Sequence, residues 1–229
     1  MPRIRALVFD FDGVLADSEP LHFRAYKEVL AEVDIPLDRD EYYRRYLGFD
    51  DVGAFAAMAQ AHGRHWTDRQ IAALVERKAL VFDDMLEKVD VMFPEAAQCI
   101  ERLSSKFPLG IASGALRHEI VAILRRSGLD DHFRFIVAAG ETPASKPAPD
   151  PYRKAAELHK VPPPACVAIE DSRWGLESAA AAGLRCVGIT TSYPAIELEG
   201  ADAIIASLDE FTEELIEAIG KRGVERNGV

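Results

Sequence analysis

Short apolar segments alternate with helical patterns along most of this chain. The first segment, Ile4 to Phe9, runs directly into Asp10-Phe11-Asp12-Gly13, which is typical of a buried strand that ends in a turn. Later segments of the same kind lie at Leu109 to Ala112, Phe135 to Ala138, Val167 to Ile169, Arg185 to Ile189 and, more weakly, Ala203 to Ile205. Strands that alternate with helices form βαβ units, so we expect an α/β fold with a doubly wound parallel sheet.

Helical patterns fill the intervals between these strands. Two of them end at a glycine, Gly128 and Gly183, which is favoured just past the end of a helix. The expected helices cover Glu95 to Lys106, Arg117 to Ser127, Pro151 to His159, Trp174 to Ala182 and Asp209 to Gly220.

The segment from about Ser18 to Met92 differs, because it contains helical runs and no convincing strand. The runs cover His22 to Glu32, Arg39 to Tyr46 and Val52 to Ala61, and a fourth begins at Thr67. Thr67 and Gln70 have the spacing of a capping box. The pattern predicts a small all-helical domain, residues 17–90, inserted after the first strand of a core formed by residues 1–16 and 91–229.

Composition limits the partners and the location. The 229 residues include 27 Lys and Arg against 38 Asp and Glu, a formal net charge of −11. Nucleic acids and anionic membranes attract basic surfaces, so neither is expected as a partner. No stretch reaches the ~18 apolar residues of a membrane span, and Arg3 and Arg5 interrupt the position of a signal peptide, so we expect a cytoplasmic protein. Cys99, Cys166 and Cys186 form no CxxC pair and are expected to be reduced, buried thiols.

Polar side chains follow four of the expected strands where each strand ends. They are Asp10 and Asp12, then Ser113 and Gly114, then Lys146, and finally Glu170 and Asp171. Parallel sheets bind ligands at the carboxyl ends of their strands, so four carboxylates and one lysine should meet in one crevice. A divalent cation would offset the cost of burying them, and oxygen ligands suit Mg²⁺. Asp171 is the expected ligand, with Glu170 binding through water.

Asp10 and Asp12 are candidates for the chemical step. Alternation along a strand directs both side chains the same way, so both can address one substrate atom. Two carboxylates at this spacing fit a nucleophile and a general acid/base. The alternative is a simple turn after a strand, because Asp and Gly are turn residues.

Ser113, Gly114 and Lys146 are candidates for binding an anion. Backbone N–H groups and a hydroxyl between a strand and a helix can hold a phosphate. Ser113 could instead cap the following helix. Lys146 lies between Pro143 and Pro147 and would be a fixed charge, or alternatively a surface lysine.

Four short stretches carry these polar residues: Asp10-Phe11-Asp12-Gly13-Val14-Leu15, Ala112-Ser113-Gly114, Ser145-Lys146-Pro147 and Glu170-Asp171-Ser172. Together they resemble the four ordered motifs of the haloacid dehalogenase superfamily. The helical insert resembles the cap of the subgroup that contains β-phosphoglucomutase, phosphoglycolate phosphatase and small sugar-phosphate phosphatases. Ser18 to His22 and Ala144 to Asp150 also resemble this subgroup. The resemblance covers essentially the whole chain and implies a Rossmann-like core with a helical cap.

The resemblance implies Mg²⁺-dependent phosphoryl transfer. Asp10 would attack phosphorus to give an aspartyl-phosphate, and Asp12 would protonate the leaving oxygen and then activate water. A halide-displacing branch of the superfamily lacks the second aspartate, so the presence of Asp12 favours phosphoryl transfer.

The resemblance also implies how the groups are held. Mg²⁺ would be bound by Asp10, by the backbone carbonyl of Asp12 and by Asp171. Ser113 and Lys146 would hold the transferring phosphoryl group.

The cap should distinguish a phosphatase from a mutase. In β-phosphoglucomutase, a cap loop that resembles Gly48-Phe49-Asp50-Asp51 carries an Arg that binds the far phosphate of a bisphosphate. This chain has Asp51 at that position, and its carboxylate should repel a second phosphate. Hydrolysis is therefore favoured, although the chain has three arginines that could substitute, namely Arg44, Arg45 and Arg64.

Three residues of the insert are candidates for contact with the substrate: His22, Gly48 and Lys78. In the family, the counterparts of His22 and Lys78 contact the acid/base loop and the substrate respectively. The alternatives are a surface or interface histidine and a solvated lysine.

Three functions thus stay open from the sequence. The first is a phosphatase acting on a small phosphomonoester, with a hexose phosphate favoured and phosphoglycolate or a nucleoside monophosphate as further substrates. The second is β-phosphoglucomutase. The third is a non-catalytic binding module, which the retention of Asp10, Asp12, Lys146 and Asp171 disfavours. A monomer is expected for a chain of this size.

Overall fold

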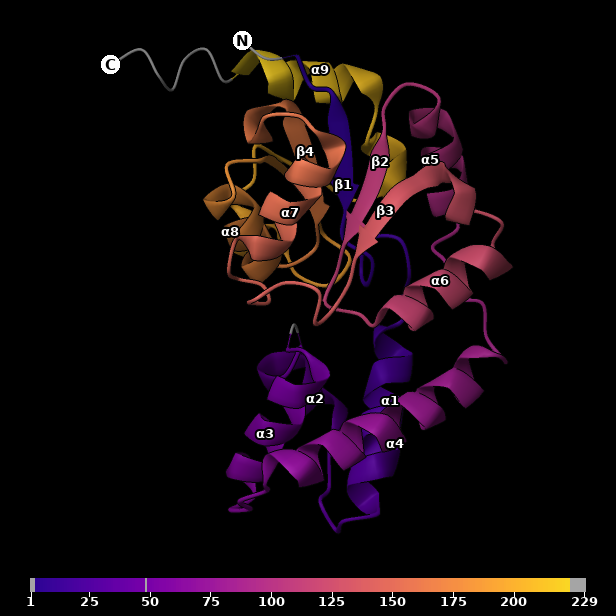
Figure 1. The fold of residues 1–229 in the computed structure, drawn as a ribbon, viewed down its shortest axis with the longest axis vertical. Coiled ribbons are helices and arrows are strands. Elements are labelled where there is room, and N and C mark those ends of the chain that lie inside the picture. Colours follow the sequence, from indigo (N-terminus) through magenta and orange to yellow (C-terminus); the bar gives the residue numbers. More distant parts are fainter. Residues whose placement is uncertain (1–2, 48, 223–229) are drawn as a thin grey trace. The chain divides into compact units, whose positions relative to one another are not determined.

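The computed structural model of the protein describes residues 3–47 and 49–222, which form two compact units. Met1–Asp17 and Met92–Val229 make up the first, which we call the α/β unit, and Ser18–Val91 makes up the second, the helical unit. Figure 1 shows the elements of both.

A parallel sheet is the centre of the α/β unit. Its strands lie in the order β3 (Phe133–Val137), β2 (Leu109–Ala112), β1 (Ala6–Phe9), β4 (Cys166–Glu170), β5 (Arg185–Ile189) and β6 (Ala203–Ile205), and every neighbouring pair is parallel. The chain starts in the middle, runs outward to β3, and returns to β4 on the other side of β1. The predicted doubly wound parallel sheet is confirmed.

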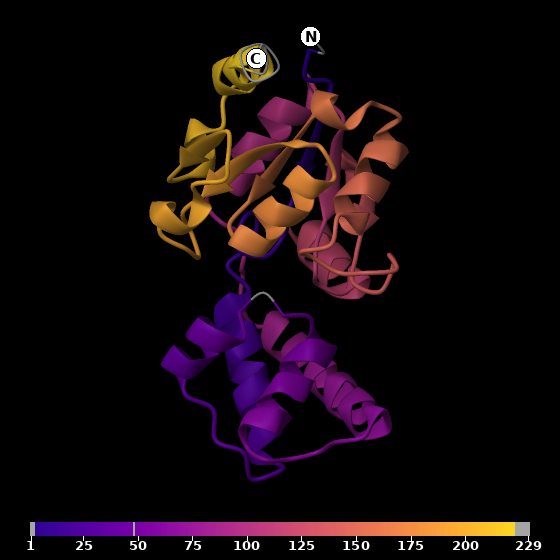
Figure 2. The same cartoon turned by 90° about the vertical axis from the view of Figure 1, so that its left-hand side faces the viewer.

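Helices cover both faces of this sheet. Helices α7 (Asp150–His159) and α8 (Arg173–Ala181) lie on one face, and α5 (Ala96–Ser104) and α9 (Glu213–Arg222) lie on the other (Figure 2). Helix α6 (Arg117–Arg126) connects β2 to β3. Strands covered on both faces are mainly apolar, and β1, β2 and β4 are buried along their whole length, with Glu170 at the end of β4 as the charged exception.

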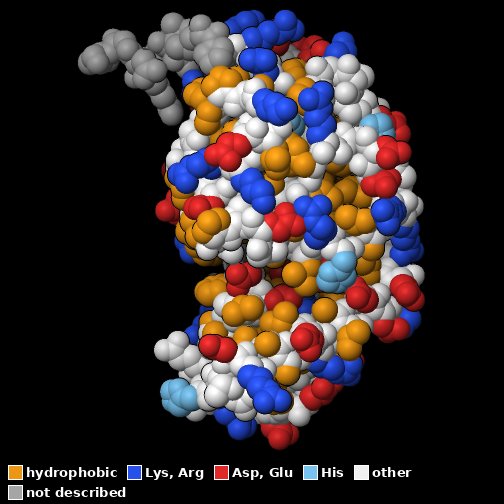
Figure 3. Space-filling model, viewed as in Figure 1, with side chains coloured by type: hydrophobic (Ala, Val, Ile, Leu, Met, Phe, Trp, Pro, Cys, Tyr) orange, Lys and Arg blue, Asp and Glu red, His pale blue; other side chains and the backbone are white. Residues whose placement is uncertain are grey.

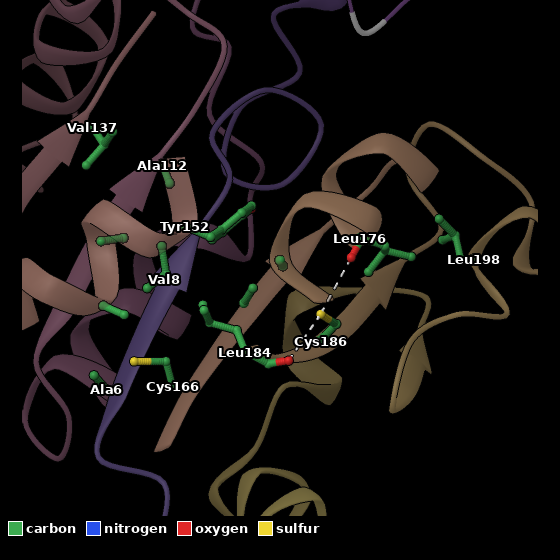
Figure 4. Close-up of a cluster of buried hydrophobic side chains, with 14 residues drawn as sticks. Ala6, Val8, Ala112, Val137, Tyr152, Cys166, Leu176, Leu184, Cys186 and Leu198 are labelled. Carbon is green, nitrogen blue, oxygen red and sulfur yellow. Dashed lines mark hydrogen bonds between the residues drawn. The ribbon is translucent and has the colours of Figure 1, made fainter. Parts of the chain in front are cut away.

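Successive residues of β1 enter different layers of the core. Val8 belongs to a buried cluster that includes Tyr152 of α7 and Leu176 of α8 (Figure 4). Phe9 faces the other way, and its ring meets the edge of Phe211 at 6.0 Å. The central strand is therefore fixed from both sides, which gives the residues after it a rigid support.

The three cysteines are free and buried. Burial raises the pKa of Cys99 to about 11 and the pKa values of Cys166 and Cys186 to about 12. Because the thiolate is the reactive form, these thiols are unreactive at neutral pH. The predicted buried thiols are thus found in the core, where the Cys186 thiol points toward the carbonyl groups of Leu176 and Leu184 (Figure 4).

Several predicted elements begin or end at other residues in the structure; the first strand, for example, begins at Ala6 and not at Ile4. Strand β3 begins at Phe133, earlier than the predicted Phe135. The last helix was expected to begin at Asp209, but α9 begins at Glu213. Leu208–Glu210 instead form a 3₁₀ turn whose N-cap is Ser207. The turn inserts the fully buried Phe211 into the core against Phe9, and this tertiary contact outweighs the local helical pattern.

The helical unit contains α1 (Glu19–Ala31), α2 (Arg39–Arg45), α3 (Asp51–Ala61) and α4 (Asp68–Leu86), and no strand among its described residues. The predicted capping box at the start of α4 is confirmed: the N–H of Thr67 donates to Gln70 Oε1 at 2.9 Å, and the N–H of Gln70 donates to Thr67 Oγ1 at 3.4 Å. Helix α4 packs against α1 and α3 and buries Phe82.

The chain segments on either side of the helical unit are joined within the α/β unit. Ala16 and Met92 form an isolated antiparallel bridge, and the N–H of Phe93 donates to the carbonyl of Leu15 at 3.0 Å. Residues distant in the sequence are thus held side by side just after β1.

Charge is mixed on the face of the α/β unit that Figure 3 shows, where Lys and Arg side chains are interspersed with Asp and Glu side chains. Among the described residues, none of the helices combines the length and the apolar character that crossing a membrane requires.

The expected monomeric state stays a prediction.

His159, at the end of α7, is buried against β1. Its Nε2 lies 3.2 Å from the carbonyl oxygen of Leu7, and its ring meets the ring of Phe135 at 4.6 Å. Burial lowers the pKa of His159 to about 4, although the bond to Leu7 acts in the opposite direction. The folded protein therefore keeps this imidazole neutral.

This histidine should make stability depend on pH between about 6.5, the ordinary pKa of histidine, and its folded value. As the pH falls through this range, the unfolded chain takes up a proton that the folded chain does not, so the free energy of unfolding should fall by roughly 2–3 kcal/mol. Urea unfolding across the range should show a smaller fall for His159→Gln. The exposed control His65→Gln should behave as wild type, and a His159→Gln variant with unchanged pH dependence would contradict this assignment.

Candidate active site

The carboxyl ends of β1 and β4 lie side by side in the middle of the sheet. Phe9 pairs with Ile169, and the N–H of Asp10 donates to the carbonyl of Ile169 at 2.9 Å. From β1 the chain proceeds toward β2 and β3, and from β4 it proceeds toward β5 and β6 on the opposite side. The order of the strands reverses here, and α/β sheets bind their ligands at such a point.

Three carboxylates meet at this point. One oxygen from each of Asp10, Glu170 and Asp171 lies within 4.8 Å of the others, and all three residues are buried. Burial and the charge of Glu170 raise the pKa of Asp10 to about 7, and burial and Asp10 raise the pKa of Asp171 well above its ordinary value. A set of oxygen donors that repel one another at this spacing fits a hard divalent cation.

Lys146 brings a positive charge to this cluster. Its Nζ lies 2.9 Å from Asp10 Oδ1 and 2.6 Å from Glu170 Oε1, and its side chain is 11% exposed. Burial alone would lower the pKa of Lys146, but the two carboxylates outweigh burial and raise the pKa above its ordinary value. The alternative of a solvated surface lysine is therefore wrong.

The loop after β1 fits closely against the carboxylates. Gly13 has a φ of +75°, and a Cβ there would lie 1.9 Å from Asp171 Oδ2, so only glycine fits. The hydroxyl of Thr191 donates to the Gly13 carbonyl. Asp12, in the same loop, is half-buried, and its carboxylate lies outside the group of three. Its expected metal contact through the backbone carbonyl stays a prediction.

Ser113 and Gly114 follow β2 at the same edge of the sheet. The N–H of Ser113 donates to the carbonyl of Val137 at 2.9 Å, and its hydroxyl accepts from the N–H of Ala115 at 3.1 Å. The N-cap of α6 is Leu116, so the alternative in which Ser113 caps that helix is wrong. Gly114 is exposed, and among the described residues other than Gly114 and its two chain neighbours, no heavy atom lies within 4 Å of a Cβ placed on it. Open space of this kind lets a ligand approach the backbone.

Glu170 and Asp171 have partners that the sequence analysis did not identify. The hydroxyl of Tyr152 donates to Glu170 Oε1 at 2.5 Å, and the hydroxyl of Ser172 donates to Oε2 at 3.2 Å. The hydroxyl of Ser192 hydrogen-bonds to Asp171. Nothing in the sequence distinguished Tyr152, because an aromatic residue at a buried helix position is typical of a core. Ser172 could have been found, since it directly follows the acidic pair.

A second group of charged side chains, centred on a buried lysine, lies in the helical unit. Lys78 is 1% exposed, and its Nζ lies 2.8 Å from His22 Nδ1 and 3.0 Å from Asp51 Oδ1. The hydroxyl of Tyr26 donates to the same Asp51 oxygen at 2.5 Å, and the His22 ring stacks on Phe82 at 4.2 Å. The alternatives of a solvated lysine and a surface histidine are therefore wrong.

Of the three candidates in the insert, the structure thus brings His22 and Lys78 together. Gly48 lies outside the described residues. That Lys78 pairs with Asp51 was not predicted, because the two positions are far apart in the sequence and lie on different helices, α4 and α3.

The chain matches a known family over most of its length. Residues 4–183 match the haloacid dehalogenase-like hydrolases, and the protein belongs to this family. The four motifs that predicted the family are the ones that the sheet brings to one edge. Membership defines the class of enzyme but not the particular reaction.

Known relatives include both a mutase and a phosphatase. β-Phosphoglucomutase of Bacillus subtilis (strain 168) is 29% identical over 218 residues, 93% of this chain and 94% of the relative. Hexitol phosphatase B of Escherichia coli (strain K12) is 30% identical over 217 residues, 92% of this chain and 95% of the relative. A crystal structure of a CbbY variant from Rhodobacter sphaeroides, in complex with xylulose-(1,5)bisphosphate, matches with a TM-score of 0.82 at 30% identity, over 90% of this chain and 96% of that one.

The ion pair between the buried Lys78 and the partly buried Asp51 should matter for stability. Asp51→Asn should lower the free energy of unfolding by roughly 3 kcal/mol, because it leaves a buried ammonium without its counterion. The double variant Asp51→Asn/Lys78→Met should recover most of this loss. Urea unfolding measures both.

A matched control is the exposed pair of Asp84 and Lys88, whose charged atoms lie 2.6 Å apart. Lys88→Met should change the free energy of unfolding by about 0.5 kcal/mol or less. An Asp51→Asn effect as small as the control would mean that the buried pair does not form.

Proposed function

We propose that this protein is a Mg²⁺-dependent phosphatase that hydrolyses a small phosphomonoester, a sugar phosphate, through an aspartyl-phosphate at Asp10. The observation that carries the proposal is the meeting of Asp10, Glu170 and Asp171 within 4.8 Å, with the Lys146 ammonium 2.9 Å from Asp10. In this proposal, residues 1–16 and 91–229 form the catalytic core, and residues 17–90 form the cap.

Two aspartates carry the chemical steps. A carboxylate oxygen of Asp10 forms a bond to phosphorus while the bond from phosphorus to the leaving oxygen breaks, and Asp12 gives that oxygen a proton. In the second step Asp12 takes a proton from water, the water oxygen bonds to phosphorus, and the bond to Asp10 breaks. The products are an alcohol and inorganic phosphate, and both aspartates return to their starting states.

Other residues hold the reacting groups. Lys146 and the backbone and hydroxyl of Ser113 and Gly114 would contact the transferring phosphoryl group. Mg²⁺ would be held by Asp10, Asp171 and the backbone carbonyl of Asp12, with Glu170 binding through water. When bound, it supplies positive charge that stabilises the phosphoryl oxygens and favours the ionised form of Asp10.

Hydrolysis rather than mutase activity is supported by the ion pair in the helical unit. Asp51 occupies the position at which the mutase resemblance implies an arginine, and it forms an ion pair with Lys78 at 3.0 Å. Lys78 weakens the repulsion that a lone carboxylate would exert on a second phosphate. Equally, Asp51 neutralises Lys78, so this pair offers no net positive charge to a bisphosphate.

The second candidate is a β-phosphoglucomutase. It is favoured by the 29% identity to the Bacillus subtilis enzyme over 93% of this chain. Replacing Asp51 by Arg would not test the mutase alternative simply, because the new cation would lie beside the buried Lys78.

We also propose that the protein is cytoplasmic, since buried free thiols fit a reducing compartment. We further propose that it is a monomer, as expected for a chain of this size.

One assay separates the two reactions. Purified protein with Mg²⁺ should release inorganic phosphate from sugar phosphates, including hexitol phosphates and β-glucose 1-phosphate, and chelation of the metal should stop the release. With β-glucose 1-phosphate, free phosphate and glucose 6-phosphate are measured separately, with and without catalytic glucose 1,6-bisphosphate. Rapid formation of glucose 6-phosphate that depends on the bisphosphate would establish the mutase instead.

The aspartate roles predict different losses. Asp10→Asn should abolish turnover, because the amide cannot form the aspartyl-phosphate. Asp12→Asn should reduce kcat by about 10²- to 10⁴-fold, the usual contribution of a general acid/base. Steady-state kinetics with the best substrate measures both, and Asp131→Asn, an exposed aspartate of the same unit, is the control. Turnover by Asp10→Asn would refute the covalent route.

A further inference from the structure

Tyr152 is a buried polar side chain that the proposed mechanism does not use. It lies on α7, is 0% exposed, and belongs to the apolar cluster that contains Val8 and Ala112 (Figure 4). A hydroxyl among apolar side chains destabilises the fold unless it finds a hydrogen-bond partner. Its partner is a charged group of the candidate active site, because the hydroxyl donates to Glu170 Oε1 at 2.5 Å.

The oxygen that binds Tyr152 is also the one that binds Lys146. Lys146 Nζ lies 2.6 Å from Glu170 Oε1 and 2.9 Å from Asp10 Oδ1. Tyr152 is thus connected to Asp10 through Glu170 and Lys146. The ammonium also lies 5.1 Å from the centre of the Tyr152 ring, within range of a cation–π interaction. Tyr152 therefore contacts both members of the ion pair.

Glu170 has little freedom to turn. Its side chain is 0% exposed, and its second oxygen accepts from the Ser172 hydroxyl at 3.2 Å. A Cβ on Gly175 would lie 1.9 Å from the Glu170 carboxyl carbon, so the first turn of α8 packs directly on the carboxylate. Helix α8 thus blocks rotation of the Glu170 carboxylate on one side. The hydrogen bond from Tyr152, which is itself fixed in the core, sets the orientation of the carboxylate on the other side.

We propose that Tyr152 is a positioning residue for phosphoryl transfer: its hydroxyl and ring hold Glu170 and Lys146 so that the ammonium is directed at Asp10. The inference rests on the proposed function. Without the hydroxyl, Glu170 Oε1 has one donor fewer and attracts the ammonium more strongly, which draws Lys146 away from Asp10. The charge that stabilises the transferring phosphoryl group is then misplaced.

Tyr152→Phe tests the proposal, because it keeps the ring and its packing and removes only the hydroxyl. With p-nitrophenyl phosphate as the probe, kcat should fall about tenfold. This is less than the ~10²-fold loss on removing a donor that contacts the transition state, because Tyr152 acts through Glu170 and Lys146. The inhibition constant of orthovanadate, which mimics the transferring phosphoryl group, should rise by a similar factor. KM should change little, and the melting temperature should fall by only a few degrees because the ring and its packing remain.

Tyr42→Phe is the matched control. It removes another buried tyrosine hydroxyl that donates to a carboxylate, Glu19, in the helical unit. This variant should keep the wild-type kcat and the wild-type inhibition by orthovanadate.

A double variant distinguishes positioning from a general structural role. In a Glu170→Gln background, Tyr152→Phe should lower kcat by less than about twofold, because the tyrosine acts through Glu170. Equal effects in both backgrounds, or a lower melting temperature with unchanged kinetics, would overturn the inference. If the wild type is active and Tyr152→Phe changes neither kcat nor the inhibition by orthovanadate, the positioning role of Tyr152 is overturned and the proposed function stands. If the wild type hydrolyses no phosphomonoester, the proposed function itself is refuted.

Discussion

Repulsion among Asp10, Glu170 and Asp171 is the constraint on which the candidate active site depends. Three carboxylates within 4.8 Å of one another, all buried, would destabilise the fold if nothing compensated them. Lys146 compensates part of the charge through Asp10 and Glu170. One ammonium offsets only part of the charge of three carboxylates, and burial together with the neighbouring carboxylates raises the pKa values of Asp10 and Asp171. The site therefore lacks positive charge, and a bound divalent cation can supply it.

Close packing fixes the positions of the carboxylates in the candidate active site. Gly13 and Gly175 have no side chain because Asp171 and Glu170 occupy the space that a Cβ would need. The two glycines bring the loop after β1 and the first turn of α8 against the carboxylates from different directions. Behind them, β1 is buried on both faces. The charged groups thus rest on a rigid support, and small rotations that would relieve their repulsion are blocked.

Most of the sheet and of the acidic cluster could be predicted because their signals are local. An apolar run that ends in Asp10, or in Glu170 and Asp171, indicates a buried strand and its polar end together. Long-range contacts could not be predicted in the same way. The start of α9 was misplaced because Phe211 packs on Phe9. Tyr152 of α7 was overlooked because its hydroxyl partner, Glu170, lies in a different element, the strand β4. The pairing of Lys78 with Asp51 was not predicted either, because the two residues are far apart in the sequence and lie on different helices.

The bridge between Ala16 and Met92 has a consequence for how such a protein can change over time. The α/β unit holds the two ends of the insert side by side. The sheet therefore does not depend on the length of the segment between these two ends. The entropic cost of closing a loop rises only slowly with the length of the loop. An entire helical segment can therefore be exchanged, enlarged or lost while the strands and their carboxylates keep their positions.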